Sequence, residues 1–120
     1  MADELYMPFQ RTQLDAGTHE SPSESVEGFA EAVYRMNAAL PSWDDPDLRV
    51  TVETWQSVDG GEKWTMIKST NFVGNSRGKD GELPGFSLSS DRTKGLIKIR
   101  MSVNRQIRLG IDGTKVEQKL

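Results

Sequence analysis

The sequence contains no cysteine and a single histidine, His19, among its 120 residues. Without cysteine the chain can form no disulfide and offer no thiolate as nucleophile or metal ligand. One histidine in a polar segment does not make a zinc site or a nucleophile–base pair. No apolar run approaches the ~20 residues of a membrane helix, and no Gly-Lys-Ser/Thr ending marks a phosphate loop. We therefore expect no enzyme activity, no cofactor, no metal and no membrane partner.

Acidic and basic residues are unevenly distributed along the chain. Residues 1–60 carry a net charge of −9 and residues 61–120 a net charge of +6, which together give −3. One interpretation is that the two halves neutralise each other within one fold. The other is that opposite charges meet between neighbouring copies. A nucleic-acid partner is not expected, because the acidic half would repel phosphate.

Short alternating runs separated by turn residues dominate the sequence. In residues 96–103, for example, Ile97, Ile99, Met101 and Val103 alternate with polar residues. Such runs at ~8–12-residue spacing are typical of a sandwich or barrel. We expect one all-β domain over residues 1–120, an antiparallel, jelly-roll-like β-sandwich. The other predicted strands are 48–56, 63–70, 86–90 and 106–111, the last followed by a turn at Asp112-Gly113 and a short strand ending near Val116.

The first 40 residues are harder to assign. We expect an extended N-terminal arm or edge strand over residues 1–16, with the arm at 1–8, and a loop over 17–25. Residues 26–40 fit a strand, but they also fit an amphipathic helix, which would make an α+β fold with a helix at 22–40. Consistency with the β-rich remainder favours the strand. Residues 72–85 hold several glycines among charged residues and predict a long loop.

The segment Ser57-Val58-Asp59-Gly60-Gly61-Glu62-Lys63-Trp64 is a strong hairpin signal, because Asp-Gly-Gly tolerates positive φ. It resembles the Asp-box of sialidases, Ser-x-Asp-x-Gly-x-x-Trp. Ser57, Asp59, Gly61 and Trp64 fill the four positions of that motif. The resemblance implies a structural turn over eight residues, with the carboxylate accepting backbone N–H groups and the indole anchoring the returning strand. A single box in the chain carries no sialidase function.

A second resemblance covers about half of the chain. The order Leu40-Pro41-Ser42-Trp43-Asp44-Asp45-Pro46, a strand, the Asp-box, a Gly-rich loop and paired alternating strands is similar to small β-sandwich virion proteins of tailed bacteriophages. The resemblance implies a non-catalytic role in a virion, as a capsid decoration or head–tail component. It also implies that the chain is assembled in the host cytoplasm and contacts other virion proteins and copies of itself.

Two sets of residues are candidates for an interface. The acidic arm of residues 1–27 contains apolar anchors and could reach a basic stripe on a neighbouring copy. Trp55 falls on the polar face of its predicted strand, where it could contact another subunit or the arm. An alternative function is a carbohydrate-binding module that uses Trp43 or Trp55, with weak glycan binding. The candidate interface residues are Leu5, Tyr6, Met7, Phe9, Trp55, Lys98, Arg100, Arg105 and Arg108.

Overall fold

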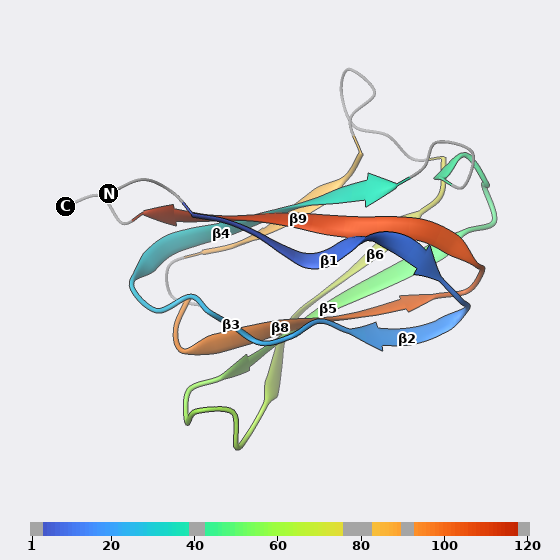
Figure 1. Ribbon diagram of the computed structural model, residues 1–120. Coiled ribbons are helices and arrows are strands. Elements are labelled where there is room, and N and C mark those ends of the chain that lie inside the picture. The colour runs from blue at the N-terminus through green and yellow to red at the C-terminus, as the bar shows by residue number, and fades with distance from the viewer. Residues whose placement is uncertain (1–3, 39–42, 76–82, 90–92, 118–120) are drawn as a thin grey trace.

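The computed structural model describes residues 4–38, 43–75, 83–89 and 93–117. These residues form nine β-strands in two antiparallel sheets that pack face to face (Figure 1). The strands are β1 (Glu4–Leu14), β2 (Gly17–Glu20), β3 (Glu24–Ser25), β4 (Phe29–Ala38), β5 (Arg49–Ser57), β6 (Thr65–Val73), β7 (Gly85–Leu88), β8 (Leu96–Val103) and β9 (Ile107–Glu117).

The strands pair in a nested order. β5 pairs with β6 as a hairpin, β4 pairs with β7, β2 pairs with β8, and β1 pairs with β9. Further pairings of β4 with β9 and of β5 with β8 join these into a four-stranded sheet, β1-β9-β4-β7, and a five-stranded sheet, β2-β8-β5-β6 with β3 also on β8. This nested arrangement is that of a jelly roll. The predicted all-β sandwich is therefore confirmed.

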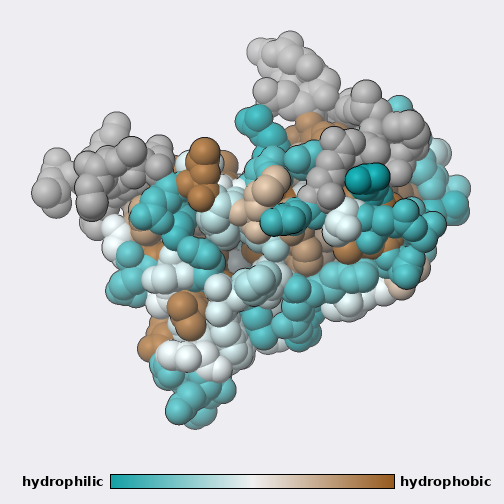
Figure 2. Space-filling view, in the orientation of Figure 1, coloured by the Kyte–Doolittle hydropathy of each residue, from teal (hydrophilic) through white to brown (hydrophobic). Residues whose placement is uncertain are grey.

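Alternate residues of both sheets fill the space between them. Ile97, Ile99, Met101 and Val103 of β8 are buried, as the alternation in the sequence predicts. The core also contains Trp43, which is fully buried although it precedes β5 and lies outside any strand. Polar and apolar residues are interspersed over the side of the sandwich seen in Figure 2.

Residues 29–38 form the strand β4, so the helical alternative for residues 22–40 is wrong within the described part of that range. Residues 17–25 are not only a loop, because they include β2 and β3, which pair with β8. The predicted loop at 72–85 lies partly outside the described residues: β6 continues to Val73, β7 begins at Gly85, and residues 76–82 are among those not described.

The N-terminal segment is a strand of the sandwich from residue 4 onward. β1 pairs with β9 from Glu4↔Lys115 to Leu14↔Ile107, so the prediction of an arm at residues 1–8 is wrong for residues 4–8. The physical reason is burial: Phe9 is 8% exposed and Tyr6 packs against the core. Deleting residues 1–9 would therefore remove part of the core.

The predicted turn at Asp112-Gly113 is also wrong, because β9 is continuous through it. A Cβ atom at Gly113 would lie 2.8 Å from a ring carbon of Tyr6 and 3.1 Å from one of Tyr34. The two tyrosine rings meet edge to face, with centroids 5.9 Å apart, and their hydroxyls share a hydrogen bond. Burial raises the pKa of both hydroxyls above their usual range. Gly113 thus makes room for an aromatic pair and does not end a strand.

The nested pairing also accounts for the uneven charge. Each salt bridge found among the described residues joins an acidic residue of 1–60 to a basic residue of 61–120. The pairs are Glu20 with Lys98 and Arg100, Asp45 and Asp47 with Arg105, and Glu4 and Glu24 with Lys115. These contacts favour the interpretation in which the two halves neutralise each other within one fold.

Lys115 is the most buried of these cations, with 5% of its side chain exposed. Its ammonium donates to Glu24 Oε1 at 2.8 Å and to the carbonyl of Ser25 at 3.0 Å, and Glu4 Oε2 lies 3.1 Å away. Burial opposes the charged form, but the bonds to Glu24 and Glu4 outweigh it, so the pKa of Lys115 is raised. The side chain connects β1 and β3 to β9.

We predict that Lys115→Ala lowers the free energy of unfolding by about 1–3 kcal/mol, because a cation bound by two carboxylates and a carbonyl is removed. Urea unfolding followed by circular dichroism measures the change. Lys63→Ala is the matched control, since the Lys63 side chain is exposed, and it should stay within about 0.5 kcal/mol of the parent. Equal effects of the two substitutions would contradict a stabilising role for Lys115.

Candidate functional site

The outer face of the five-stranded sheet carries polar side chains in rows across the strands. One row contains Thr18 and Ser102, whose hydroxyls are 2.9 Å apart, and continues to Thr51, whose hydroxyl donates to Asn71 Oδ1 at 2.9 Å. The next row contains Glu20, Arg100 and Glu53. These side chains share a face because residues directly opposite in an antiparallel ladder point the same way.

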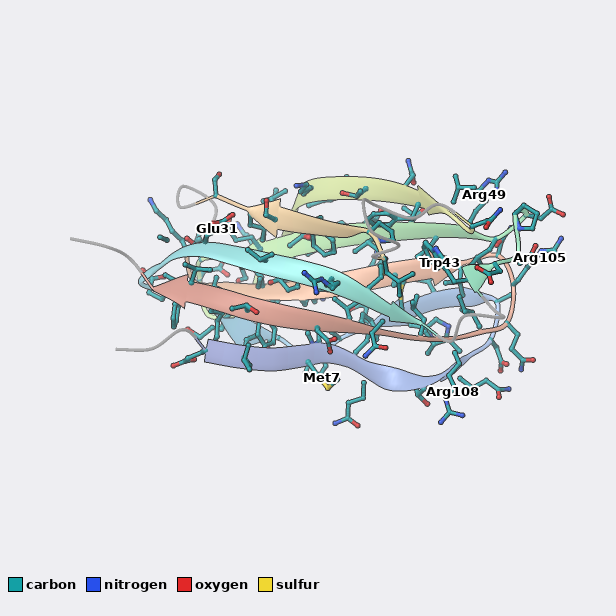
Figure 3. The ribbon with its side chains drawn as sticks, turned by 90° about the horizontal axis from the view of Figure 1, so that it is seen from above. Met7, Glu31, Trp43, Arg49, Arg105 and Arg108 are labelled. Carbon is teal, nitrogen blue, oxygen red and sulfur yellow. The ribbon has the colours of Figure 1, made fainter. Side chains whose placement is uncertain are left out.

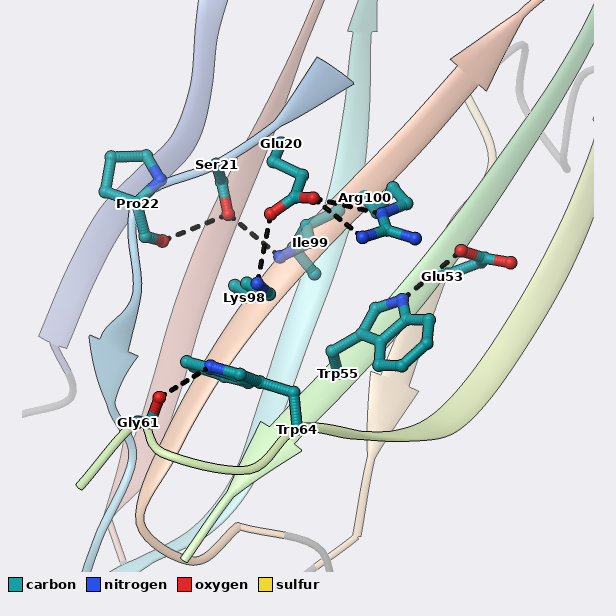
Figure 4. A network of polar contacts seen from close by, with 10 residues as sticks. All are labelled: Glu20, Ser21, Pro22, Glu53, Trp55, Gly61, Trp64, Lys98, Ile99 and Arg100. Carbon is teal, nitrogen blue, oxygen red and sulfur yellow. Dashed lines mark hydrogen bonds and ion pairs between the residues drawn. The ribbon is translucent and has the colours of Figure 1, made fainter. Parts of the chain in front are cut away.

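Two half-buried tryptophans lie on this face, each beside a cation (Figure 4). The guanidinium of Arg100 lies 4.9 Å from the ring centroid of Trp55, and the ammonium of Lys98 lies 4.5 Å from that of Trp64. Both distances are within the range of cation–π attraction. Lys98 is also the cross-strand partner of Trp55, so the four side chains form one continuous patch.

Glu20 connects the two cations. Its carboxylate lies 3.0 Å from Lys98 Nζ and 2.8 Å from Arg100 Nη2. Hydrogen bonds from Arg100 and then from Lys98 lower the pKa of Glu20. Trp55 Nε1 donates to Glu53 Oε1 at 3.2 Å, which adds a second acidic group beside the first tryptophan. We refer to Glu20, Glu53, Trp55, Trp64, Lys98 and Arg100 as the tryptophan–cation patch.

The turn between β5 and β6 positions Trp64. Asp59 Oδ1 accepts from the backbone N–H groups of Lys63 and Glu62 at 3.0 and 3.1 Å, and these bonds, with one from the Ser57 hydroxyl, lower the pKa of Asp59. Trp64 Nε1 donates to the carbonyl of Gly61 at 3.1 Å. The hairpin predicted for residues 48–70 is therefore present. Its turn spans residues 58–64, so β6 begins at Thr65.

The predicted interface residues do not lie together. Lys98 and Arg100 belong to the patch, whereas Arg105 pairs with Asp45 and Asp47 at one end of the molecule, and Arg108 lies beside β1 on the other sheet (Figure 3). The prediction that Lys98, Arg100, Arg105 and Arg108 form one basic stripe is therefore wrong. The physical reason is that β8 and β9 belong to different sheets, so their polar faces point in opposite directions.

The apolar anchors expected in the arm are divided between two environments. Tyr6 and Phe9 point into the sandwich, while Leu5 and Met7 are exposed. Because β1 is in the four-stranded sheet, it does not cover Trp55. Trp55 is covered instead by Arg100.

Trp43 cannot serve as a sugar-binding surface, because it is fully buried. The second tryptophan beside Trp55 is Trp64, which the Asp-box resemblance assigned only to the turn. The sequence contains a signal for this role. Trp55 precedes the predicted turn and Trp64 follows it, so a hairpin with this turn brings the two tryptophans near each other. Glu20 was missed because its segment was predicted to be a loop.

The patch presents two aromatic rings beside paired charges, which are groups suited to binding. Within the described ranges, no three His, Asp or Glu residues are grouped so that they could hold a metal ion. No helix in these ranges is long and apolar enough to span a membrane.

No protein-family model matches the chain, and no curated protein matches its sequence. Solved structures do match its fold. The carbohydrate-binding module CBM27-1 of Caldicellulosiruptor saccharolyticus, solved with mannohexaose, is 10% identical, with a TM-score of 0.53 over 95% of this chain and 82% of that one.

Two further structures are similar. The VP2 subviral particle of infectious bursal disease virus is 10% identical, with a TM-score of 0.55 over 96% of this chain and 32% of that one. A protein from Sulfurospirillum deleyianum is 11% identical, with a TM-score of 0.50 over 98% of both chains. At these identities the likeness shows the fold alone. The chain is thus a jelly-roll sandwich of a kind found both in viral capsid proteins and in carbohydrate-binding modules.

We predict that Gly61→Val destabilises the protein by about 1–3 kcal/mol, because Gly61 has a φ of 97°, which a β-branched residue adopts only with strain. Chemical unfolding monitored by tryptophan fluorescence measures the change. Glu62→Val introduces the same side chain at the next position, where φ is not positive, and should cost much less. If both variants unfolded at the same denaturant concentration, backbone strain at Gly61 would not explain the effect.

Proposed function

We propose that this chain is a non-catalytic structural protein of a tailed-bacteriophage particle, present in multiple copies as a capsid decoration or head–tail component. It would be assembled in the host cytoplasm and reside in the virion, in contact with other virion proteins. The observation that carries the proposal is the nested jelly-roll order of the two sheets, built around a filled core.

Two further observations support this role. The fold is similar to part of a viral capsid protein, VP2, over 96% of this chain. In addition, the polar groups of the tryptophan–cation patch are already paired within the chain, which gives a rigid surface and leaves little reactive chemistry. A rigid face with half-buried tryptophans and an arginine is typical of protein interfaces. The choice of a tailed-bacteriophage particle rests on the sequence resemblance, that is, on the order of motifs that this chain shares with small virion proteins of these phages.

We predict that the chain is a stoichiometric component of purified particles. Particles banded in a density gradient would be analysed by quantitative mass spectrometry, with a known capsid protein as the internal standard. A constant ratio to that standard across the gradient peak is the expected result. If the chain remained in the soluble host lysate and was missing from banded particles, the proposal would be wrong.

A second candidate function is glycan binding, and one observation favours it. Trp55 and Trp64 lie on one sheet face beside charged side chains, and stacking on an aromatic ring combined with polar contacts is a common way to bind a ligand. The similar fold of a module solved with mannohexaose shows that this architecture is compatible with such a ligand. Arg100 and Lys98 already occupy positions over the two rings, which argues against free stacking surfaces.

We predict that the patch contacts protein and not sugar. Isothermal titration with mannohexaose and a glycan array should give no specific binding by the parent chain. Specific binding that is lost in Trp55→Ala and in Trp64→Ala, both still folded by circular dichroism, would instead establish the second function. Val58→Ala, an exposed substitution in the neighbouring turn, is the control and should leave any binding unchanged.

A further inference from the structure

We propose that a second copy of this chain docks, with two-fold symmetry, on the outer face of the four-stranded sheet. The inference deepens the proposed multi-copy role and rests on it for its biological setting, but the docking itself is a property of the purified chain. It follows from the sheet edges, the apolar residues of this face, its hollows and its charges.

Edge-to-edge pairing of sheets is blocked at all four edges of the described sandwich. β1 contains Pro8, which lacks an N–H donor, and its ladder has two register shifts. β2 and β7 are four residues long. On β6, Lys68 lies opposite the buried Thr54 and its ammonium donates to the carbonyl of Ser87 at 2.7 Å, so a charge points inward at that edge. Such features prevent strand addition, so copies must meet through faces or loops.

The outer face of the four-stranded sheet carries exposed apolar side chains. Leu5 is 81% exposed, Met7 49% and Val33 40%, which is half of the large exposed hydrophobic residues found among the described ones. Leu5 of β1 and Val33 of β4 are both register partners of Thr114, which lies on β9 between these two strands. They therefore belong to one row of side chains, which continues from Val33 to Ser87 of β7. Figure 3 shows the molecule with this face toward the viewer.

Three adjoining hollows cross the same face. The first, of about 460 Å³, is lined by Leu5, Met7, Asp112 and Thr114 among others. The second, of about 230 Å³, shares Asp112 and Thr114 and reaches Val33. The third, of about 320 Å³, lies over β4 and β7, where Gly85 contributes no side chain. The face therefore has apolar projections on β1 and an open hollow on β7.

A two-fold axis makes these features complementary. If the axis runs along the strands between β9 and β4, the sheet order β1-β9-β4-β7 places β1 of one copy over β7 of the other. The row positions then bring Leu5 of one copy over Ser87 and the third hollow of the other, and Val33 over Thr114. The twist of packed sheets changes these alignments only moderately over the central rows.

Charge follows the same symmetry. Arg35 and Asp112 are register partners on β4 and β9, on the two sides of the proposed axis. Rotation about that axis therefore places Arg35 of each copy opposite Asp112 of the other, which gives two attractive contacts. Within a copy, Asp112 Oδ2 accepts from Asn37 Nδ2 at 3.4 Å. An interface needs about 800 Å² from each partner, and the wide face of a molecule measuring 42 × 33 × 20 Å can supply it.

The test is a charge swap between copies, measured by sedimentation velocity over a concentration series of the full chain. The parent should dimerise. Arg35→Asp and Asp112→Arg should each weaken self-association by about tenfold or more, because like charges then face each other. A mixture of the two variants should dimerise again, since the introduced carboxylate at position 35 would face the introduced guanidinium at position 112, and the unchanged Asp112 would face the unchanged Arg35. The double variant should recover for the same reason.

Val33→Lys should also weaken the dimer, while Val73→Lys should not, because Val73 is equally exposed, at 42%, but lies on β6 of the other sheet. Circular dichroism verifies that every variant is folded. A parent chain that stays monomeric up to ~100 µM, or a mixture that fails to recover, would overturn the inference. Incorporation of the chain into particles is measured separately, so a monomeric chain found in particles would refute the docking face and leave the proposed function standing.

Discussion

The structure depends on one constraint: every strand finds its partners in the other half of the chain. All seven pairings among the described strands join one of β1–β5 to one of β6–β9. Neither half can therefore satisfy its own backbone hydrogen bonds as a sheet. The β5–β6 hairpin is the only local pairing in this set, and each pair outside it must close a longer loop.

The charge distribution is a consequence of this constraint. Because strands of the acidic half lie beside strands of the basic half, Glu20 meets Lys98 and Arg100 across a ladder, and Lys115 is enclosed by Glu4 and Glu24. The exposed pairs, such as Arg105 with Asp47, contribute about 0–1 kcal/mol each. The charges also favour one register, since a one-residue shift of the β2–β8 ladder would place Glu20 opposite the buried Ile99 or Met101, on the core face of the sheet.

The outer faces of the two sheets differ in the contacts that their charged side chains make. On the five-stranded sheet, the cations are held by carboxylates and lie over tryptophan rings, so the face is polar and internally paired. On the four-stranded sheet, apolar residues alternate with hollows and with charges of both signs. The first face suits a rigid contact with a different protein or a ligand, and the second suits a copy of itself.

Strands with a clear alternation of apolar and polar residues could be predicted from the sequence. β8 has the predicted bounds, 96–103, and the hairpin around Asp59 is where turn chemistry places it. β2 was missed because Gly17–Glu20 has no apolar alternation, and only its ladder with β8 makes it a strand. The prediction divided β9 at Gly113, because local rules cannot show that two tyrosine rings occupy the space that a side chain at this position would need.

The functional surface was harder to predict for a related reason. The alternation identified Lys98 and Arg100 as one polar face, but it could not show that Arg108 lies on the opposite sheet, because sheet membership is a property of the whole topology. The burial of Trp43 likewise depends on packing from both sheets. The sequence alone therefore predicted the fold class and the strands with a clear alternation, whereas the positions of side chains on the two outer faces required the structure.

The most direct test of the nested pairing is to divide the chain at the turn between Asp59 and Gly60 and to study the two halves, residues 1–59 and 60–120. Circular dichroism should show each half alone without a cooperative thermal transition, because no described strand has a partner in its own half. An equimolar mixture should regain the β-sheet spectrum and a cooperative transition. A half that folds alone, or halves that remain unfolded when mixed at high concentration, would contradict this account.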